Sequence, residues 1–318
     1  MKILFQTDIL NYRGSTVAIA DYARYNQSIL GNESVICYNA SAPWTLDVGT
    51  EPEVVANMQQ EFNVIAYNDI NELQSIIDRE KIDLLYNGNG FIPANCPVVM
   101  HEVWKRNHAQ PEFKAYAYIS EWLSTSMNKI YGVDHPYVPH IVKLPEPNGD
   151  MREELGIQPG QTVIGRIGGY LTFDVYFVLQ AIAKIVTERD DFVFVFVGTQ
   201  PWGEHPNIKY IPAFNDAQRK ANFFNTCDAT IHARSNGESF GLAIAESLYM
   251  NKPVLAWEGG GDQNHTLMLK DSGLIYTPET VADKILNIRD YAAAEDWRKR
   301  VEQFGPDQVM NKFKQVFL

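Results

Sequence analysis

Two glutamates stand eight positions apart in the stretch "GESFGLAIAE", where Glu238 and Glu246 flank Gly241. The acid/base pair of a glycoside hydrolase needs its two carboxyl groups within about 5 to 9.5 Å of each other. If most of the stretch is helical, a rise of about 1.5 Å per residue separates the two glutamates by roughly 12 Å along the axis. They also point about 80° apart around that axis. We therefore expect them to contact two ends of an extended ligand, not one reacting atom.

The residues around Gly241 favour a phosphate site. The stretch follows the strand-like run "ATIHA" and leads into an apolar segment, 240–250, that we expect to be a buried helix ending before Pro253. A glycine in the first turn lets a ligand approach backbone amides that have no partner inside the helix. Since helix N-termini attract anions, a phosphate there would have Glu238 on one side and Glu246 on the other. A diphosphate between two hydroxylated rings, a sugar and a ribose, would satisfy both carboxylates.

The same residues also have a purely structural explanation. Glu246 could be a buried glutamate paired with a basic residue, and Gly241 could simply allow close packing. Each residue alone fits that explanation, whereas the constellation favours a ligand site. A second glycine-rich stretch, "WEGGGDQNH" from Trp257 to His265, follows a strand-like run and could line the same cleft, but glycines alone are weak evidence.

The composition is that of an ordinary globular protein. At 318 residues, with 45% apolar and 21% charged residues, the chain is long enough for two domains with separate cores. The net charge of −12 and the lack of a dense run of Lys and Arg argue against a nucleic-acid partner and against a polybasic membrane anchor.

Cysteine usage and the N-terminus predict a cytoplasmic protein without a metal. Cys37, Cys96 and Cys227 are too widely spaced for a zinc site or a disulfide framework, so we expect inert thiols. The start, "MKILFQTDIL", indicates a first strand and not a signal peptide. We find no run of about 18 or more apolar residues and therefore expect no integral membrane segment.

Short strand-like runs alternate along the whole chain with segments whose apolar residues recur at the spacing of a helix. The runs "KILFQT", "SVICYN", "FNVIAY", "IDLLYN", "CPVVM" and "AYAYIS" precede a break at 144–150, and "TVIGRI", "FVFVFVG", "IKYIP", "ATIHA" and "PVLAW" follow it. This alternation is typical of βαβ units with parallel sheets. We predict an α/β fold of two Rossmann-like doubly wound domains facing a cleft, with C-terminal helices. The predicted domains are residues 1–147 and 148–318, with the option that the last helix packs back on the first domain.

The stretch "GESFGLAIAE", followed by "NKPVLAW", resembles the Glu-seven-residues-Glu motif of the retaining GT-B-fold glycosyltransferases. These are the group 1 glycosyl transferases of the glycogen-synthase and sucrose-synthase-like superfamily. The resemblance covers most of the chain, is specific around the motif and is loose in the first domain. It implies an acceptor-side domain followed by a domain that binds a nucleotide-sugar donor.

The resemblance also implies roles for individual residues of the second domain. Glu238 would be catalytic and contact the transferred sugar, whereas Glu246 would contact the ribose of the donor nucleotide. Backbone amides near Gly241 and Leu242 would hold the diphosphate. Arg166 of "TVIGRIGG" stands where the superfamily places an arginine on the diphosphate, although it could instead be a surface ion-pair residue.

Two residues of the first domain resemble parts of the same site. Gly14 of "NYRGST" resembles a glycine loop that closes over the donor phosphate, and His101 after "CPVVM" resembles a catalytic histidine that faces the donor sugar. His101 could equally be a loop histidine whose hydrogen bonds are satisfied. The superfamily usually has a lysine shortly after its arginine, but "RIGGYLTFD" has none. Arg234 or Arg13 could supply that charge.

Retaining sugar transfer is the function that the resemblance implies. The donor would be a nucleoside-diphosphate sugar, UDP- or GDP-linked, and the acceptor a hydroxyl of a glycan or another molecule. The enzyme would be of the hexosyltransferase type and need neither a metal nor a cofactor. Two alternatives stay open: a non-catalytic nucleotide-sugar or glycan-binding protein of the same fold, which the missing lysine favours, and a GT-B-fold sugar-nucleotide epimerase.

Overall fold

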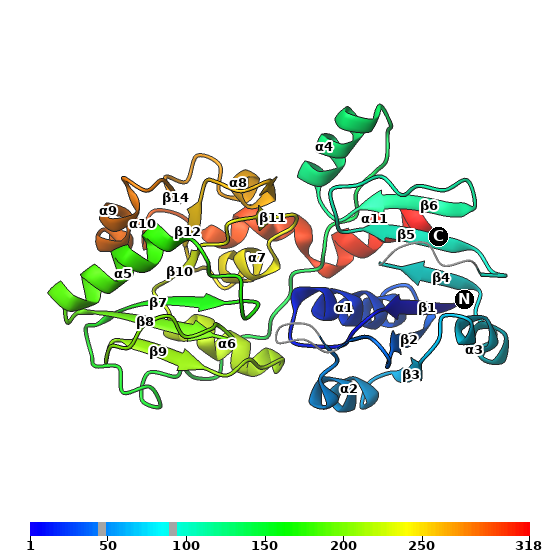
Figure 1. Cartoon of the computed structure of the whole chain (residues 1–318), viewed down its shortest axis with the longest axis horizontal. Coiled ribbons are helices and arrows are strands. Elements are labelled where there is room, and N and C mark those ends of the chain that lie inside the picture. Colours follow the sequence, from blue (N-terminus) through cyan, green and yellow to red (C-terminus); the bar gives the residue numbers. More distant parts are fainter. Residues whose placement is uncertain (44–48, 89–93) are drawn as a thin grey trace. The chain divides into compact units, whose positions relative to one another are not determined.

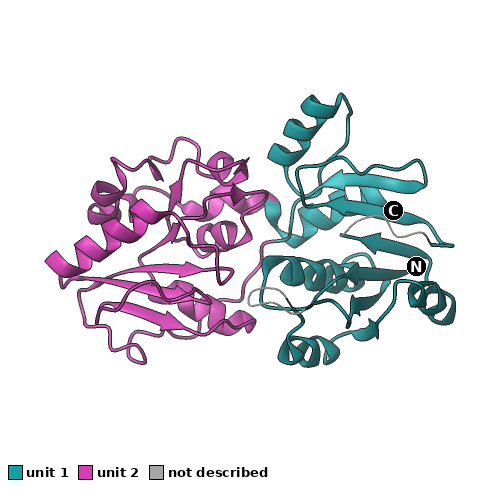
Figure 2. Cartoon of the chain, viewed as in Figure 1, with its two compact units in different colours: residues 1–141, 304–318 teal, residues 142–303 magenta. Residues whose placement is uncertain are grey.

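The computed structural model describes residues 1–43, 49–88 and 94–318, which form two compact units (Figures 1 and 2). Unit 1 comprises Met1–Ile141 and Phe304–Leu318, and unit 2 comprises Val142–Gln303. The chain therefore leaves unit 1 after its first sheet, builds unit 2 and returns to unit 1 with its last helix (Figure 2).

Unit 1 contains a six-stranded parallel sheet of order β3-β2-β1-β4-β5-β6. Its elements, in chain order, are β1 (Lys2–Thr7), α1 (Gly14–Ser28), β2 (Glu33–Asn39), α2 (Pro52–Gln59), β3 (Asn63–Tyr67), α3 (Glu72–Glu80), β4 (Leu84–Asn87), β5 (Val98–Glu102), β6 (Phe113–Tyr118), α4 (Glu121–Tyr131) and α11 (Pro306–Phe317).

Unit 2 contains a second six-stranded parallel sheet, of order β14-β12-β10-β7-β8-β9, and a two-stranded sheet of β11 and β13. Its elements are β7 (Thr162–Ile167), α5 (Tyr176–Glu188), β8 (Phe192–Val197), β9 (Ile208–Ile211), α6 (Ala217–Thr226), β10 (Ala229–His232), β11 (Gly237–Glu238), α7 (Leu242–Tyr249), β12 (Val254–Trp257), β13 (Asp262–Gln263), α8 (Asn264–Met268), β14 (Ile275–Tyr276), α9 (Val281–Leu286), α10 (Ile288–Ala292) and the 3-10 helix η1 (Trp297–Phe304). Two parallel α/β sheets confirm the predicted fold class.

Helix boundaries differ from the sequence pattern where local capping decides them. α4 was not predicted; it begins because the Ser120 side chain accepts a hydrogen bond from the Leu123 amide, and it ends at Gly132 in the left-handed region, at φ 66. The expected C-terminal helices are divided into α9, α10, η1 and α11.

The unit 1 sheet is buried on both of its faces. Along β1, Ile3 and Phe5 pack into one apolar cluster and Leu4 packs into another, which also contains Leu73 and Ile76 of α3. A strand covered on both faces needs apolar side chains at successive positions. This explains why the strand signals in the sequence are continuous apolar runs.

Helix α11 covers one face of the unit 1 sheet. Its inward side chains, Val309, Met310, Phe313 and Phe317, are at most 1% exposed and belong to the cluster that contains Phe5. The Phe313 ring stacks on Tyr86 with 5.7 Å between centroids. The segment that follows unit 2 in the sequence is therefore part of the unit 1 core.

The packing of α11 predicts the effect of Phe313→Ala. Removing a fully buried ring should lower the free energy of unfolding by about 3–5 kcal/mol. Urea titration measures the loss, and hydrogen exchange should quicken in the strands of unit 1 but not in unit 2. The exposed Gln315→Ala on the same helix is the control and should change the free energy by less than about 0.5 kcal/mol. Equal losses for the two variants would contradict this packing role.

Candidate functional site

The stretch that carries the two glutamates begins at a tight turn after β10. Gly237 has φ +73, a left-handed conformation that glycine adopts without strain. A Cβ atom at Gly237 would lie 1.9 Å from the main-chain oxygen of Asp262. The missing side chain lets β11 pair with β13 in register Gly237↔Asp262 and Glu238↔Gln263. Glu238 is thus fixed on a short strand and not on the following helix.

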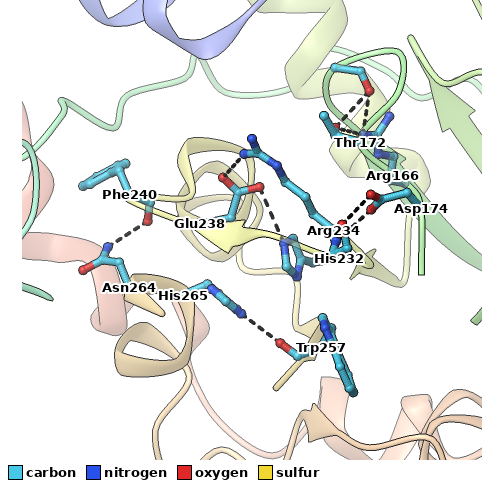
Figure 3. Close-up of polar contacts among 12 residues, drawn as sticks. Arg166, Thr172, Asp174, His232, Arg234, Glu238, Phe240, Trp257, Asn264 and His265 are labelled. Carbon is cyan, nitrogen blue, oxygen red and sulfur yellow. Dashed lines mark hydrogen bonds and ion pairs between the residues drawn. The ribbon is translucent and has the colours of Figure 1, made fainter. Parts of the chain in front are cut away.

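The Glu238 carboxylate has two partners close to its own turn (Figure 3). Its Oε2 accepts a hydrogen bond from Nη1 of Arg234 at 3.0 Å, and its Oε1 lies 3.5 Å from Nε2 of His232. Burial alone would raise the pKa of Glu238, but the contact with His232 and the charges of His232, Arg234 and His265 lower it below its usual value. The side chain is 23% exposed, so an ionised carboxylate is held within reach of a ligand.

Helix α7 starts at Leu242, with Gly241 as its N-cap at φ +89. Gly241 itself offers no side-chain hydrogen bond to this end, because glycine has no side chain. The amides of the first turn at Leu242 and Ala243, both partly exposed, therefore keep the anion-binding capacity of a helix N-terminus.

Glu246 lies in the middle of α7 and pairs with Lys220 of α6. Nζ of Lys220 donates to Oε1 of Glu246 at 2.7 Å, and the two side chains are only 10% and 6% exposed. The structure thus supplies the basic partner that the structural explanation of Glu246 requires. A carboxylate can accept about four hydrogen bonds, so the pair still leaves room for a hydroxyl. Glu238 and Glu246 belong to separate polar clusters.

Arg166 lies near the end of β7, and its side chain reaches the loop 169–172. Its guanidinium donates to the Thr172 hydroxyl at 2.6 Å (Figure 3). It also donates to the Thr199 hydroxyl and to the main-chain oxygen of Gly169, the latter at 2.9 Å. At 5% exposure it is buried, which argues against a surface ion-pair residue. In this conformation Arg166 organises the loop after β7.

That loop is tied to the turn of Glu238. The Asp174 carboxylate accepts hydrogen bonds from the Ser235 amide at 2.7 Å and from the Ser235 hydroxyl at 2.5 Å. Because β7 and β10 are neighbours in the sheet, the turns at their carboxyl ends lie side by side. Unit 2 thus brings together Arg166, Arg234, Glu238, Gly241, Leu242 and Glu246 at one edge of its sheet or on the helix that follows.

The other two predicted residues, Gly14 and His101, lie in unit 1. Gly14 is exposed at the first position of α1. His101 of β5 is 1% exposed; its Nε2 donates to the Val138 oxygen at 2.8 Å, so its Nδ1 accepts from the Tyr86 hydroxyl at 2.5 Å. Burial lowers the pKa of His101 to about 4, although the bonds to main-chain oxygens oppose this. Both ring nitrogens are thus satisfied within unit 1.

Three partners of the candidate site were not singled out from the sequence as site residues. His232 contacts Glu238, His265 packs on His232, and Lys220 pairs with Glu246. The strand run "ATIHA" ends in a histidine and the glycine-rich stretch ends in another, which is the signal that could have linked them. Nothing in the sequence marks Lys220 apart from other helix lysines.

Unit 2 matches a known family of enzymes. The model of the family described as glycosyl transferases group 1 matches residues 161–290. Unit 2 therefore carries a group 1 glycosyl transferase domain, and the predicted enzyme class, a glycosyltransferase, is confirmed. No curated protein matches the sequence.

Solved structures share the fold over nearly the whole chain. Anabaena HepE, solved with UDP-glucose, is similar with a TM-score of 0.73 and 14% identity, over 99% of this chain and 100% of HepE. A glycosyltransferase of Rickettsia africae has a TM-score of 0.66 and 16% identity, over 98% and 94%. A Listeria monocytogenes protein assigned as a UDP-N-acetylglucosamine 2-epimerase has a TM-score of 0.64 and 12% identity, over 98% and 94%. These likenesses establish a GT-B-type fold of two Rossmann-like domains.

Residues 1–43, 49–88 and 94–318 contain neither a candidate membrane span nor a candidate metal site. None of their helices has the length and apolar character needed to cross a membrane. In the same part of the chain, no three His, Cys, Asp or Glu side chains gather in a way that could hold a metal ion.

The buried pair of Lys220 and Glu246 predicts an asymmetric response to substitution. Glu246→Ala should lower the free energy of unfolding by about 3–5 kcal/mol, because it leaves the Lys220 ammonium buried without a partner. The double variant Lys220→Met/Glu246→Leu should recover most of that loss, and urea titration measures both.

The matched control for this pair is on α5, where Lys184 and Glu188 are 3.9 Å apart but 72% and 61% exposed. Glu188→Ala should cost less than about 1 kcal/mol. If the double variant were as unstable as Glu246→Ala, the unpaired charge would not be the cause.

Proposed function

We propose that this protein is a retaining, metal-independent glycosyltransferase that transfers a hexosyl group from a UDP-linked donor to a hydroxyl acceptor. The observation that carries the proposal is the ionised, partly exposed Glu238, which precedes the glycine-capped N-terminus of α7. The group 1 glycosyl transferase domain supports the reaction class. The UDP-glucose complex of HepE, which has the same fold, supports a UDP donor over a GDP donor.

Stabilising the leaving diphosphate is the main catalytic task in such a reaction. The backbone amides at the N-terminus of α7, near Gly241 and Leu242, are fixed dipoles that would meet the negative charge as it develops. Arg234 uses one guanidinium nitrogen on Glu238, and its other donors could replace the missing lysine. Arg166 would contribute positive potential from its buried place near the end of β7.

The bond changes balance without a metal. The bond between the anomeric carbon and the diphosphate oxygen breaks, and the acceptor oxygen bonds to the same face of that carbon. The acceptor's proton moves to the leaving phosphate oxygen. In this scheme the Glu238 carboxylate accepts a hydrogen bond from a hydroxyl of the transferred sugar, and its charge favours the positive anomeric carbon.

The remaining predicted residues have secondary parts in the proposal. Glu246, whose charge is balanced by the ion pair with Lys220, would accept a hydrogen bond from a ribose hydroxyl through its remaining lone pairs. Gly14 would approach the donor phosphate. For His101 to contact the donor sugar, its Nε2 would have to leave the Val138 oxygen.

We place the reaction in the cytoplasm, which suits the three free cysteines.

The proposal predicts stabilisation by UDP. At 100 times its dissociation constant, UDP should add about 2.7 kcal/mol of stability. For a unit of this size, that raises the melting temperature by several degrees, on the order of 2–4 °C per kcal/mol. GDP, ADP, CMP and dTDP should shift it less, and EDTA should not abolish the UDP effect. A shift that needs magnesium would contradict metal independence, and no shift with any nucleotide would favour a protein that has lost donor binding.

Substitutions of the two glutamates should affect different steps, Glu238 the sugar transfer and Glu246 the binding of UDP. Glu238→Ala should lower sugar transfer by on the order of 10²-fold while the UDP dissociation constant stays nearly unchanged. In the stable Lys220→Met/Glu246→Leu background, UDP binding should weaken instead. Product chromatography and calorimetry measure the two effects. Wild-type turnover in Glu238→Ala would overturn its role, and conversion of the donor sugar without an acceptor would indicate an epimerase.

A further inference from the structure

Two buried histidines lie beneath the turn that carries Glu238 (Figure 3). His232, at the end of β10, is 8% exposed, and His265 of α8 is fully buried. Their ring centroids are 4.6 Å apart with 44° between the planes. The His265 ring also supports the backbone of the turn, because a Cβ at Gly237 would lie 3.2 Å from its Cε1. The two rings thus form a stack that begins at the Glu238 carboxylate.

The far end of this stack is anchored. Nε2 of His265 bonds to the Trp257 oxygen at 2.8 Å, and a carbonyl only accepts, so this nitrogen carries the proton. Burial and the charge of His232 lower the pKa of His265 to about 4, although the bond to Trp257 and the charge of Glu238 oppose this. His265 is therefore neutral near pH 7, and one tautomer is fixed.

At the end of the stack next to Glu238, the hydrogen-bonding capacity of the His232 ring is not satisfied. Among the described residues, neither ring nitrogen of His232 has a partner within normal hydrogen-bond geometry, and Oε1 of Glu238 lies 3.5 Å from Nε2. A buried polar group without a partner is costly, so such groups often have a functional reason. The carboxylate proposed to contact the sugar is an acceptor that could offset this cost for His232.

One segment, residues 260–265, packs against the turn of Glu238 and carries His265. We call this segment the clamp. A Cβ at Gly260 would lie 2.5 Å from the Gly237 amide nitrogen, so the clamp is pressed against the turn. Asp262–Gln263 pair with Gly237–Glu238, and the Asn264 side chain donates to the Phe240 oxygen at 2.7 Å. The clamp thus fixes the backbone on both sides of Glu238 and delivers His265 beneath it.

We infer that His232 and His265 are positioning residues for Glu238: His232 shares its proton with the carboxylate, and His265 holds the His232 ring in place. The inference rests on the proposed function, because the role of Glu238 in sugar transfer belongs to that proposal. It also gives the glycine-rich stretch a purpose, which is to bring His265 under the catalytic turn.

Several charged and titratable groups surround the His232 ring and bear on its effect. Glu238 faces it from β11 and His265 from α8, and Arg234 of the turn after β10 holds the other Glu238 oxygen. Tyr276 of β14 donates its hydroxyl to the His232 main-chain oxygen at 2.5 Å. With His232 removed, Arg234 still holds one Glu238 oxygen, so the carboxylate should lose part of its pKa depression but stay in the site.

The test measures the titration of Glu238 by carboxyl carbon NMR of protein labelled at glutamate. The Glu238 signal is the one that disappears in Glu238→Gln. His232→Asn should raise the pKa of Glu238 by about 1, because it removes the ring that lies 3.5 Å from the carboxylate and favours its ionised form. His205→Asn is the matched control: this histidine lies in a loop of unit 2, bonded to the Asn207 amide, and should leave the titration unchanged.

Kinetics provide the second readout. His232→Asn and His265→Ala should each lower kcat by on the order of 10-fold to 10²-fold with little change in the donor KM, since they misplace the carboxylate without touching the nucleotide. The acid limb of the pH profile should move to higher pH in His232→Asn. Leu267→Ala, on the exposed side of α8, is the control for that helix and should retain full activity.

The outcomes separate the inference from the proposed function. An unchanged Glu238 pKa in His232→Asn, in an active enzyme, would overturn the inference and leave the transferase proposal intact. A raised pKa in a protein that transfers no sugar would support the coupling of His232 to the carboxylate and overturn the proposed function.

Discussion

The parallel pairing of Gly237–Glu238 with Asp262–Gln263 is the constraint on which the candidate site depends. This pairing requires glycine at two positions where the backbones of the two segments come very close. Gly237 lies against the Asp262 oxygen, and Gly260 lies against the Gly237 amide. The pairing takes Glu238 out of helix α7 and leaves Gly241 as the N-cap. A larger residue at either glycine would separate the strands, so backbone packing and not side-chain attraction sets the geometry.

Much of the fold could be predicted from the sequence because both sheets are parallel and covered on both faces. Such strands are continuous apolar runs, and "KILFQT" and "FVFVFV" correspond closely to β1 and β8. Elements without that signal were not predicted: α4 begins at a side-chain cap, α2 begins at Pro52 without one, and β11, β13 and β14 are two residues long. Helix α7 starts later than the apolar pattern suggests because Gly241 adopts a left-handed conformation.

The candidate site could be predicted only as far as its residues lie close together in sequence. The spacing of Glu238, Gly241 and Glu246 was visible, because one turn and one helix carry all three. Their partners arise from tertiary packing: Lys220 reaches Glu246 from another helix, and His265 reaches His232 through the pairing of two very short strands. The environment of His101, with both nitrogens bonded inside unit 1, depends likewise on the return of the chain near Val138.

The place of α11 in the unit 1 core has a consequence for biosynthesis. Domains generally fold as units while the chain leaves the ribosome, the N-terminal one first. Here the first sheet emerges early, but the helix that covers one of its faces is made only after all of unit 2. Unit 2 can therefore complete its core before unit 1 does. Until then the nascent chain exposes the apolar surface around Phe5 and Tyr86, which is the kind of surface that chaperones bind.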